Sequence, residues 1–95
     1  LTCKIEIEVQ SLEEFSQVIS LSRKPNIIML DNMNIDYMRK AVEIRNKKSQ
    51  EILLEASGGV NEDNILEIAE TGIDFISVGS LTHSTKILDI HLIIF

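Results

Sequence analysis

The sequence predicts an α/β fold in which four parallel strands alternate with helices. Strand-like apolar segments begin at residues 4, 26, 51 and 74, and a helix-like segment follows each of the first three. This spacing, one strand and one helix in about 22 to 25 residues, is typical of βα units that pack their helices outside a parallel sheet. Four consecutive βα units make half of a TIM-like (β/α) barrel, which takes about 250 residues in full. A four-stranded doubly wound sheet is the structural alternative.

The first half of the chain contains two predicted strands around one helix. Residues 4–9 alternate apolar and polar side chains, with the period of two that a strand has. Ser11 and Glu14 have the spacing of a capping box, and they predict a helix that ends near Ser22. After Pro25, residues 26–30 form a continuous apolar run, typical of a strand that is buried on both faces.

The second half repeats the alternation. Asn34 is expected to cap a second helix, and Asn61 a third helix that stops at Gly72. Residues 51–55 and 74–78 are the third and fourth predicted strands, while the apolar tail after them, 86–95, is ambiguous between helix and strand. The basic side chains of the second helix are expected to form one solvated face: Arg39, Lys40, Arg45, Lys47 and Lys48.

Composition limits the class of protein and its partners. The 95 residues are 44% hydrophobic, which indicates one small globular domain, and the net charge of −6 argues against nucleic acid as a partner. No apolar run approaches the roughly 20 residues that span a membrane, so no membrane partner is expected. The single cysteine, Cys3, excludes an internal disulfide and suits the cytoplasm, where we expect the protein to act. The chain opens on Leu1 and enters a strand at once, from which we expect a segment of a longer protein.

Two glycine turns follow predicted strands. Ser57, Gly58 and Gly59 come after the third strand, and Val78, Gly79 and Ser80 end the fourth. A strand that passes into a helix through glycine exposes backbone N–H groups, which bind anions and most often phosphate. Because parallel neighbouring strands end at the same edge of a sheet, the two turns predict one phosphate site between them.

Acidic residues end three successive strands. Glu8, Asp31 and Glu55 are expected to face the same mouth of the sheet, where carboxylates suit either Mg²⁺ or ribose hydroxyls. Next to a phosphate site they predict a phosphorylated sugar as ligand. The simpler alternative is that Glu6 and Glu8 are solvent-facing strand residues and that the glycines only make turns. His83, after the second turn, is either a helix cap or a proton donor.

Four segments, in chain order, carry a family resemblance. They are residues 4–9 (KIEIEV), 28–33 (IMLDNM), 54–60 (LEASGGV) and 71–84 (TGIDFISVGSLTHS), followed by LDI at 88–90. Together they resemble the C-terminal part of the quinolinate phosphoribosyltransferase family, also called nicotinate-nucleotide pyrophosphorylase (carboxylating). The resemblance covers nearly the whole chain and implies that residues 1–95 are the C-terminal half of an α/β-barrel catalytic domain, without the rest of the barrel or the N-terminal domain.

The resemblance implies a Mg²⁺-dependent enzyme of NAD biosynthesis. Such an enzyme transfers a phosphoribosyl group from phosphoribosyl pyrophosphate to quinolinate and releases pyrophosphate and CO₂, giving nicotinate mononucleotide. Glu8 and Asp31 match the acidic pair that holds the metal and the ribose hydroxyls and serves catalysis. The two glycine turns match the loops that bind the 5′-phosphate, and His83 matches a histidine of the family. A homodimer or a higher homo-oligomer is implied as well.

One part of the family's site has no counterpart here. The family binds the two carboxylates of quinolinate with a cluster of Arg, Lys and His residues from upstream strands, the N-terminal domain and the partner subunit. Residues 1–95 supply no such cluster, so we expect the isolated segment to be inactive. Two alternatives are a molybdenum-transport-associated protein of the same superfamily and a non-catalytic half-barrel that binds phosphate.

Overall fold

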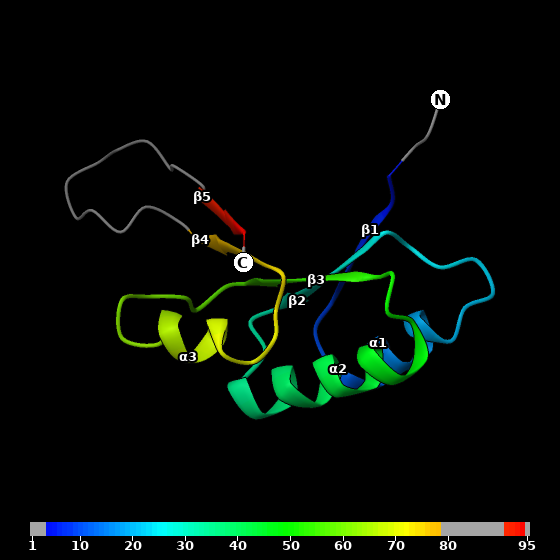
Figure 1. Ribbon diagram of the computed structural model, residues 1–95, viewed down its shortest axis with the longest axis horizontal. Coiled ribbons are helices and arrows are strands. Elements are labelled where there is room, and N and C mark those ends of the chain that lie inside the picture. Colours follow the sequence, from blue (N-terminus) through cyan, green and yellow to red (C-terminus); the bar gives the residue numbers. More distant parts are fainter. Residues whose placement is uncertain (1–3, 79–90, 95) are drawn as a thin grey trace.

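The structure, a computed structural model, describes residues 4–78 and 91–94 as one five-stranded sheet with helices (Figure 1). Its elements are β1 (Glu6–Val9), α1 (Leu12–Ile19), β2 (Ile27–Asp31), α2 (Ile35–Lys48), β3 (Leu53–Ser57), α3 (Ile65–Ala69), β4 (Phe75–Val78) and β5 (His91–Ile94). The strands are ordered β1-β2-β3-β4-β5, with β1 to β4 parallel and β5 antiparallel to β4. The predicted α/β fold with four consecutive parallel strands is confirmed.

The three described helices lie on one face of the sheet (Figure 1). Alternate strand residues point to this face and are fully buried: Val9, Ile28, Leu30, Leu54, Ala56 and Ile76. The helices cover them with Phe15 and Ile19 of α1, Met38, Ala41 and Val42 of α2, and Ile68 of α3. A doubly wound sheet carries helices on both faces. The described residues instead form a section of barrel wall, with the helices outside.

The opposite side of the sheet, called here the open face, has no described helix over it. The remaining strand residues point to it: Glu6, Glu8, Ile27, Met29, Asp31, Leu53, Glu55, Ser57, Phe75 and Ser77. The expectation that β2 is buried on both faces therefore holds for one face only: Ile28 and Leu30 are buried, whereas Ile27 and Met29 are half-buried.

The predicted cap of the first helix is present, and the helix is shorter than expected. The backbone N–H of Glu14 donates to Ser11 Oγ over 3.1 Å, as in a capping box. The helix ends at Ile19 rather than near Ser22, because side chains occupy its last carbonyl groups. Ser20 Oγ donates to the carbonyl of Ser16 over 2.8 Å, and Lys24 Nζ donates to that of Ile19 over 2.6 Å.

The second predicted cap is confirmed, and the third caps a turn that leads into α3. Asn34 Oδ1 accepts the backbone N–H of Tyr37 over 2.8 Å at the start of α2. Asn61 Oδ1 accepts the N–H groups of Asp63 and Asn64 over 2.8 and 3.1 Å, and its carbonyl accepts that of Ile65 over 3.0 Å, as in an N-cap. The regular helix α3 nevertheless begins only at Ile65, one turn after Asn61.

The C-terminal tail contributes a strand. Residues 91–94 of the ambiguous segment form β5, which adds an antiparallel edge next to β4. The other residues of that segment, and any helix of the fourth βα unit, lie outside the described residues.

Arg45 is not part of a solvated basic face, which corrects the sequence-based prediction. Its side chain is buried, and Nη1 lies 2.7 Å from Asp74 Oδ2 and donates to the carbonyl of Ile52 over 2.8 Å. Its Nη2 donates to the carbonyl of Gly72 over 3.3 Å, while Asp74 Oδ2 also accepts the N–H of Leu54 over 2.9 Å. Arg45 therefore joins the end of α2 to the starts of β3 and β4.

We expect Arg45→Ala to lower the free energy of unfolding by about 3 kcal/mol, since it leaves Asp74 without its charge partner and two carbonyl groups without a donor. Lys47→Ala, on the same helix, is the matched control. Lys47 pairs with Glu43 over 3.2 Å in an exposed position, and removing such a pair costs less than about 1 kcal/mol. Urea unfolding followed by circular dichroism measures both, and equal effects of the two variants would contradict the role given to Arg45.

Candidate functional site

The register of the parallel strands lines up polar side chains near their carboxyl ends. Asp31 of β2 is the register partner of Ser57 on β3, and Ser57 is the partner of Ser77 on β4. All three side chains point to the open face. Two residues earlier on β2, Met29 has Glu8 of β1 as its register partner on one side and Glu55 of β3 on the other. The predicted convergence of Glu8, Asp31 and Glu55 on one side of the sheet is therefore what the structure has.

Glu8 and Asp31 lie close enough to interact. The negative charge of Asp31, followed by a hydrogen bond to it and by a small loss of hydration, raises the pKa of the exposed Glu8 carboxyl above its usual value. Gln10, which the sequence did not single out, donates from Nε2 to Asp31 Oδ2 over 3.3 Å. Two adjacent carboxylates repel each other, and the repulsion is relieved when a cation or hydroxyl donors bind between them.

Glu55 and Glu6 form a second acidic pair on the open face. The side chain of Glu55 is buried, 6% exposed, and its Oε2 accepts a hydrogen bond from the Ser77 hydroxyl. A hydrogen bond to Glu55, then burial, and then the charges of Glu55 and Glu8 raise the pKa of Glu6 to about 7. The alternation of Glu6 and Glu8 with isoleucine already places both on one face, so this face was predictable, whereas the contact with Glu55 across β2 was not.

The first predicted glycine turn is packed against the end of β2. Gly58 and Gly59 have φ values of +81° and +69°, and Asn32 has φ of 54°. The N–H of Asn32 donates to the carbonyl of Ser57 over 2.6 Å. A Cβ atom on Gly58 would lie 3.2 Å both from the nitrogen of Asn32 and from Asp31 Oδ1. The left-handed backbone and this close approach both require glycine, and they bring the turn next to the Asp31 carboxylate.

The far side of the turn is held by the loop before α3. Asn64 Nδ2 donates to the carbonyl of Gly59 over 2.7 Å, and Asn64 Oδ1 accepts the N–H of Asn61 over 2.8 Å. Asn61 thus contributes to the site indirectly, because the turn that it caps positions Asn64 next to Gly59.

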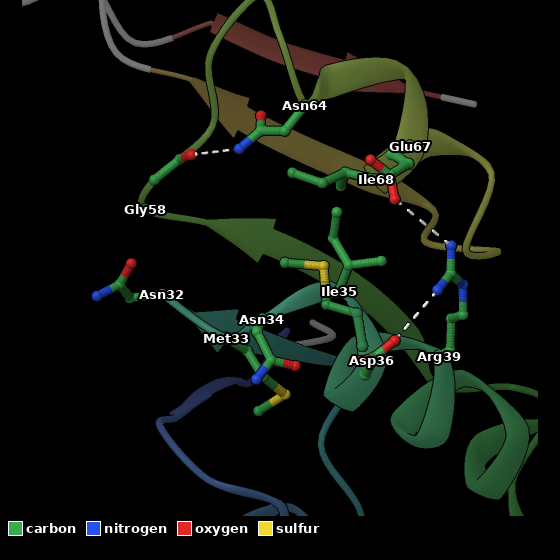
Figure 2. A pocket seen from close by; sticks show the side chains of 12 residues that line it. Asn32, Met33, Asn34, Ile35, Asp36, Arg39, Gly58, Asn64, Glu67 and Ile68 are labelled. Carbon is green, nitrogen blue, oxygen red and sulfur yellow. Dashed lines mark hydrogen bonds and ion pairs between the residues drawn. The ribbon is translucent and has the colours of Figure 1, made fainter.

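A pocket of about 570 Å³ opens beside the turn, between the starts of α2 and α3 (Figure 2). Its buried lining is apolar and comes from Met33, Met38 and Ile68. At its exposed side, Arg39 pairs with Asp36 over 3.3 Å and with Glu67 over 3.8 Å. Its full lining is Asn32, Met33, Asn34, Ile35, Asp36, Met38, Arg39, Gly58, Gly59, Asn64, Glu67 and Ile68. Gly58 and Gly59 belong to the first predicted turn, but no motif marks the pocket as a whole, because its walls come from segments that only the fold brings together.

The second predicted turn lies mostly outside the described residues. Val78 is the last residue of β4, and β4 runs parallel to β3 with Ser77 in register with Ser57. The strands before the two predicted turns are therefore neighbours. Gly79, Ser80 and His83 are among the residues that the structure does not describe, so their assigned roles stay predictions.

Two kinds of feature are absent from the described residues. Within residues 4–78 and 91–94, no group of three or more His, Cys, Asp or Glu side chains is arranged to hold a metal ion. The helices of the same residues include none with the length and apolar character needed to cross a membrane.

The comparisons with known proteins agree on one family. A family model described as quinolinate phosphoribosyl transferase, C-terminal domain, matches residues 1–93. The nicotinate-nucleotide pyrophosphorylase (carboxylating) of Mycobacterium leprae is 42% identical over 87 residues, which are 92% of this chain and 30% of that protein. A probable nicotinate-nucleotide pyrophosphorylase (carboxylating) of Methanocaldococcus jannaschii is 42% identical over 95 residues, 96% of this chain and 33% of that protein.

Solved structures agree with the sequence relatives. The nicotinate-nucleotide pyrophosphorylase of Francisella tularensis superposes with a TM-score of 0.70 at 40% identity, over 92% of this chain and 30% of that one. The enzyme of the same name from Ehrlichia chaffeensis gives 0.69 at 42% identity, over 95% and 31% of the two chains. The chain thus spans about a third of the length of the relatives that it matches.

We expect Gly58→Ala to weaken phosphate binding and to destabilise the fold. A left-handed backbone costs an alanine about 1–2 kcal/mol, and the added carbon would press on Asn32 and on Asp31. Gly72→Ala is the matched control, since Gly72 has φ of +99° and its Cβ would meet Val42 at 2.8 Å, away from the strand ends. Unfolding experiments should show a loss for both variants, and titration with inorganic phosphate followed by NMR a loss for Gly58→Ala alone. Equal phosphate binding by the two variants would remove the turn from the site.

The raised pKa of Glu6 predicts a pH-dependent stability. Its pKa of about 7 in the folded state lies above the ordinary value of 4.5, so the folded chain holds more protons than the unfolded chain between these values. The stabilisation is complete below pH 4.5 and is lost as the pH rises through about 7. In urea unfolding at several pH values, the native chain should therefore lose stability relative to Glu6→Gln as the pH rises. Parallel profiles for the two chains would show that Glu6 ionises normally.

Proposed function

The chain belongs to the quinolinate phosphoribosyl transferase family, and on this premise we propose that it supplies the phosphoribosyl-binding part of an enzyme of NAD biosynthesis. The proposed reaction joins the ring nitrogen of quinolinate to C1 of the ribose of phosphoribosyl pyrophosphate. Pyrophosphate leaves with the electron pair of the C1–O bond, and loss of CO₂ with uptake of a proton completes nicotinate mononucleotide.

One observation carries this proposal: the acidic pair and the glycine turn are in contact. Asp31 Oδ1 lies 3.2 Å from the position of a Cβ on Gly58, and Glu8 interacts with Asp31. A ligand that carries hydroxyl groups and a phosphate a few ångströms apart suits such a site. Phosphoribosyl pyrophosphate has both, with its 5′-phosphate assigned to Gly58 and Gly59 and its ribose hydroxyls to Glu8 and Asp31.

The same two carboxylates have a role in the reaction. As pyrophosphate departs, positive charge builds up on C1 and the ring oxygen of the ribose. The negative charges of Glu8 and Asp31, already in place on a partly shielded sheet face, stabilise this charge more than they stabilise the neutral substrate. Their hydrogen bonds to the ribose hydroxyls hold the sugar in the orientation that the nitrogen of quinolinate attacks.

The residues fit Mg²⁺ as the cofactor. Mg²⁺ binds through one or two carboxylates together with water and substrate phosphates, and the close pair Glu8 and Asp31 offers two such oxygen donors. A cluster of three protein ligands is not needed for this mode of binding. When bound, the ion neutralises charge on the departing pyrophosphate.

Quinolinate itself needs groups that the open face lacks. The residues of β1 to β4 that point to the open face have acidic, hydroxyl or apolar side chains, and none of them is Lys, Arg or His. Two carboxylates of a substrate require convergent cations. Because the chain spans about a third of its relatives, we assign this function to the remainder of the enzyme and propose that residues 1–95 alone do not catalyse the reaction.

Two alternatives share the architecture: a molybdenum-transport-associated relative and a non-catalytic phosphate-binding module. The relatives reported above are named as pyrophosphorylases, which favours the enzyme.

Assembly as a homodimer or higher homo-oligomer stays part of the proposal. A cytoplasmic location stays a prediction, and the names of plant relatives include a chloroplastic protein of Oryza sativa and a mitochondrial one of Nicotiana tabacum.

The test compares the chain alone with the chain in a complete enzyme. We expect no nicotinate mononucleotide from residues 1–95, and turnover from a chimera in which they replace the matching segment of the Methanocaldococcus jannaschii relative. In the chimera, Asp31→Asn should lower kcat about 100-fold or more, as loss of transition-state charge stabilisation does. Glu43→Gln, on the exposed side of α2, is the control and should leave kcat unchanged. A chimera that folds and binds no phosphoribosyl pyrophosphate with Mg²⁺ at millimolar concentration would refute the proposed function.

A further inference from the structure

Ser77, which no motif singled out, shares the end row of the sheet with two site residues. It is the register partner of Ser57, which is the partner of Asp31, and the three side chains point to the open face. Ser77 is half-buried. In this row Ser57 separates it from Asp31, so a sugar that lies over Ser57 contacts both.

The hydrogen of the Ser77 hydroxyl is already committed. It is donated to Glu55 Oε2, a carboxylate oxygen of a side chain that is 94% buried (6% exposed). Turning the hydroxyl away would remove a donor from this buried carboxylate, which costs more than an ordinary hydrogen bond returns. A hydrogen bond to Glu55 is also the largest cause that raises the pKa of Glu6 to about 7, as expected if Glu55 is an acceptor in this network.

A serine hydroxyl has one hydrogen and two lone pairs. With the hydrogen directed to Glu55, the Ser77 oxygen can only accept hydrogen bonds from a ligand. The charge behind it also makes the oxygen a stronger acceptor, since hydrogen bonds in a chain polarise one another. Such a group attracts a hydroxyl or an N–H group and repels a phosphate oxygen that has no hydrogen.

We propose that Ser77 binds a hydroxyl group of the sugar ligand, and that Glu55 is a positioning residue that acts through Ser77 by holding its hydrogen. This inference rests on the proposed function and deepens it, because it assigns an orientation to the ligand. The hydroxyl-bearing edge of the sugar faces Ser77 and Asp31, and the phosphate lies toward the amides of Gly58 and Gly59. The direct contact of Glu55 with substrate, expected from the sequence, is replaced by an indirect role.

The experiment uses the chimera described above and measures kcat, KM and the dissociation constant for phosphoribosyl pyrophosphate. Ser77→Ala removes one acceptor, so KM and the dissociation constant should rise about 3- to 10-fold, the equivalent of one hydrogen bond. The value of kcat should stay within about twofold, because the contact is made equally in the ground state and the transition state. Ser77→Thr keeps the hydroxyl and should retain the native values.

Glu55 is tested with two variants of similar volume. Glu55→Met fills the space without an acceptor and should raise KM as Ser77→Ala does. Glu55→Gln keeps a carbonyl oxygen for the Ser77 hydroxyl and should restore most of the affinity. In the Ser77→Ala background, Glu55→Met should have no further effect on KM, since Glu55 then has no hydroxyl to position.

The matched control is Ser49→Ala. Ser49 is also a buried serine, its Oγ has no hydrogen-bond partner among the described residues, and it lies at the far end of α2 from the site. This variant should keep the native KM and kcat. Thermal unfolding of each chimera verifies that the proteins are folded at the assay temperature.

The outcomes separate this inference from the proposed function. If the native chimera turns over and Ser77→Ala leaves KM unchanged, or if Glu55→Met and Ser77→Ala add their effects independently, the inference is wrong and the proposed function stands. If the native chimera neither binds phosphoribosyl pyrophosphate nor turns over, the proposed function itself fails. The inference is supported if KM rises with Ser77→Ala and stays native with Ser77→Thr. It also requires that Glu55→Met adds no further rise in KM to that of Ser77→Ala.

Discussion

The parallel register of β1 to β4 is the constraint on which the rest of the structure depends. Because side chains alternate along a strand, one register decides for all four strands which residues the helices bury and which face the other way. In this register the apolar residues Leu30, Ala56 and Ile76 form one row under the helices. A shift of one residue on β3 would bury Glu55 under α2 and expose Leu54. The same pairing that builds the core therefore also brings the polar residues of the open face together.

The site is built from contacts between loops that belong to different βα units. Asn32 donates to the carbonyl of Ser57, and Gly58 packs against the backbone of Asn32 so closely that a side chain has no room. Asn64 holds the turn from the side of α3. Turn and carboxylate are thus fixed relative to each other before any ligand arrives, and such preorganisation reduces the entropy lost on binding. Arg45 acts at the opposite end of the strands. Its ion pair with Asp74 and its hydrogen bonds to two carbonyl groups hold α2 against the starts of β3 and β4.

The open face carries apolar side chains (Ile27, Met29, Leu53 and Phe75) together with acidic side chains that repel one another when no ligand lies between them. Glu8 next to Asp31, and Glu6 next to Glu55, are arrangements that cost stability. Stability alone does not favour two acidic pairs on one sheet face, whereas a ligand that brings hydroxyl groups and a cation does. The hydroxyl of Ser77 relieves part of this cost by donating to Glu55. Glu55 is buried although no described helix covers its face.

The sequence by itself determined the order and type of the elements from β1 to β4, the three helix caps, the burial of the apolar rows under the helices, and the placement of Glu8, Asp31 and Gly58 at strand ends. These features follow from local periodicity and turn chemistry, which a chain expresses without knowledge of distant residues. Only the tertiary structure decided the burial of Arg45, the bond between Ser77 and Glu55, and the pocket beside α2. Each of them joins residues from different βα units, and the energy of a side chain in such a contact depends on partners that no local pattern specifies.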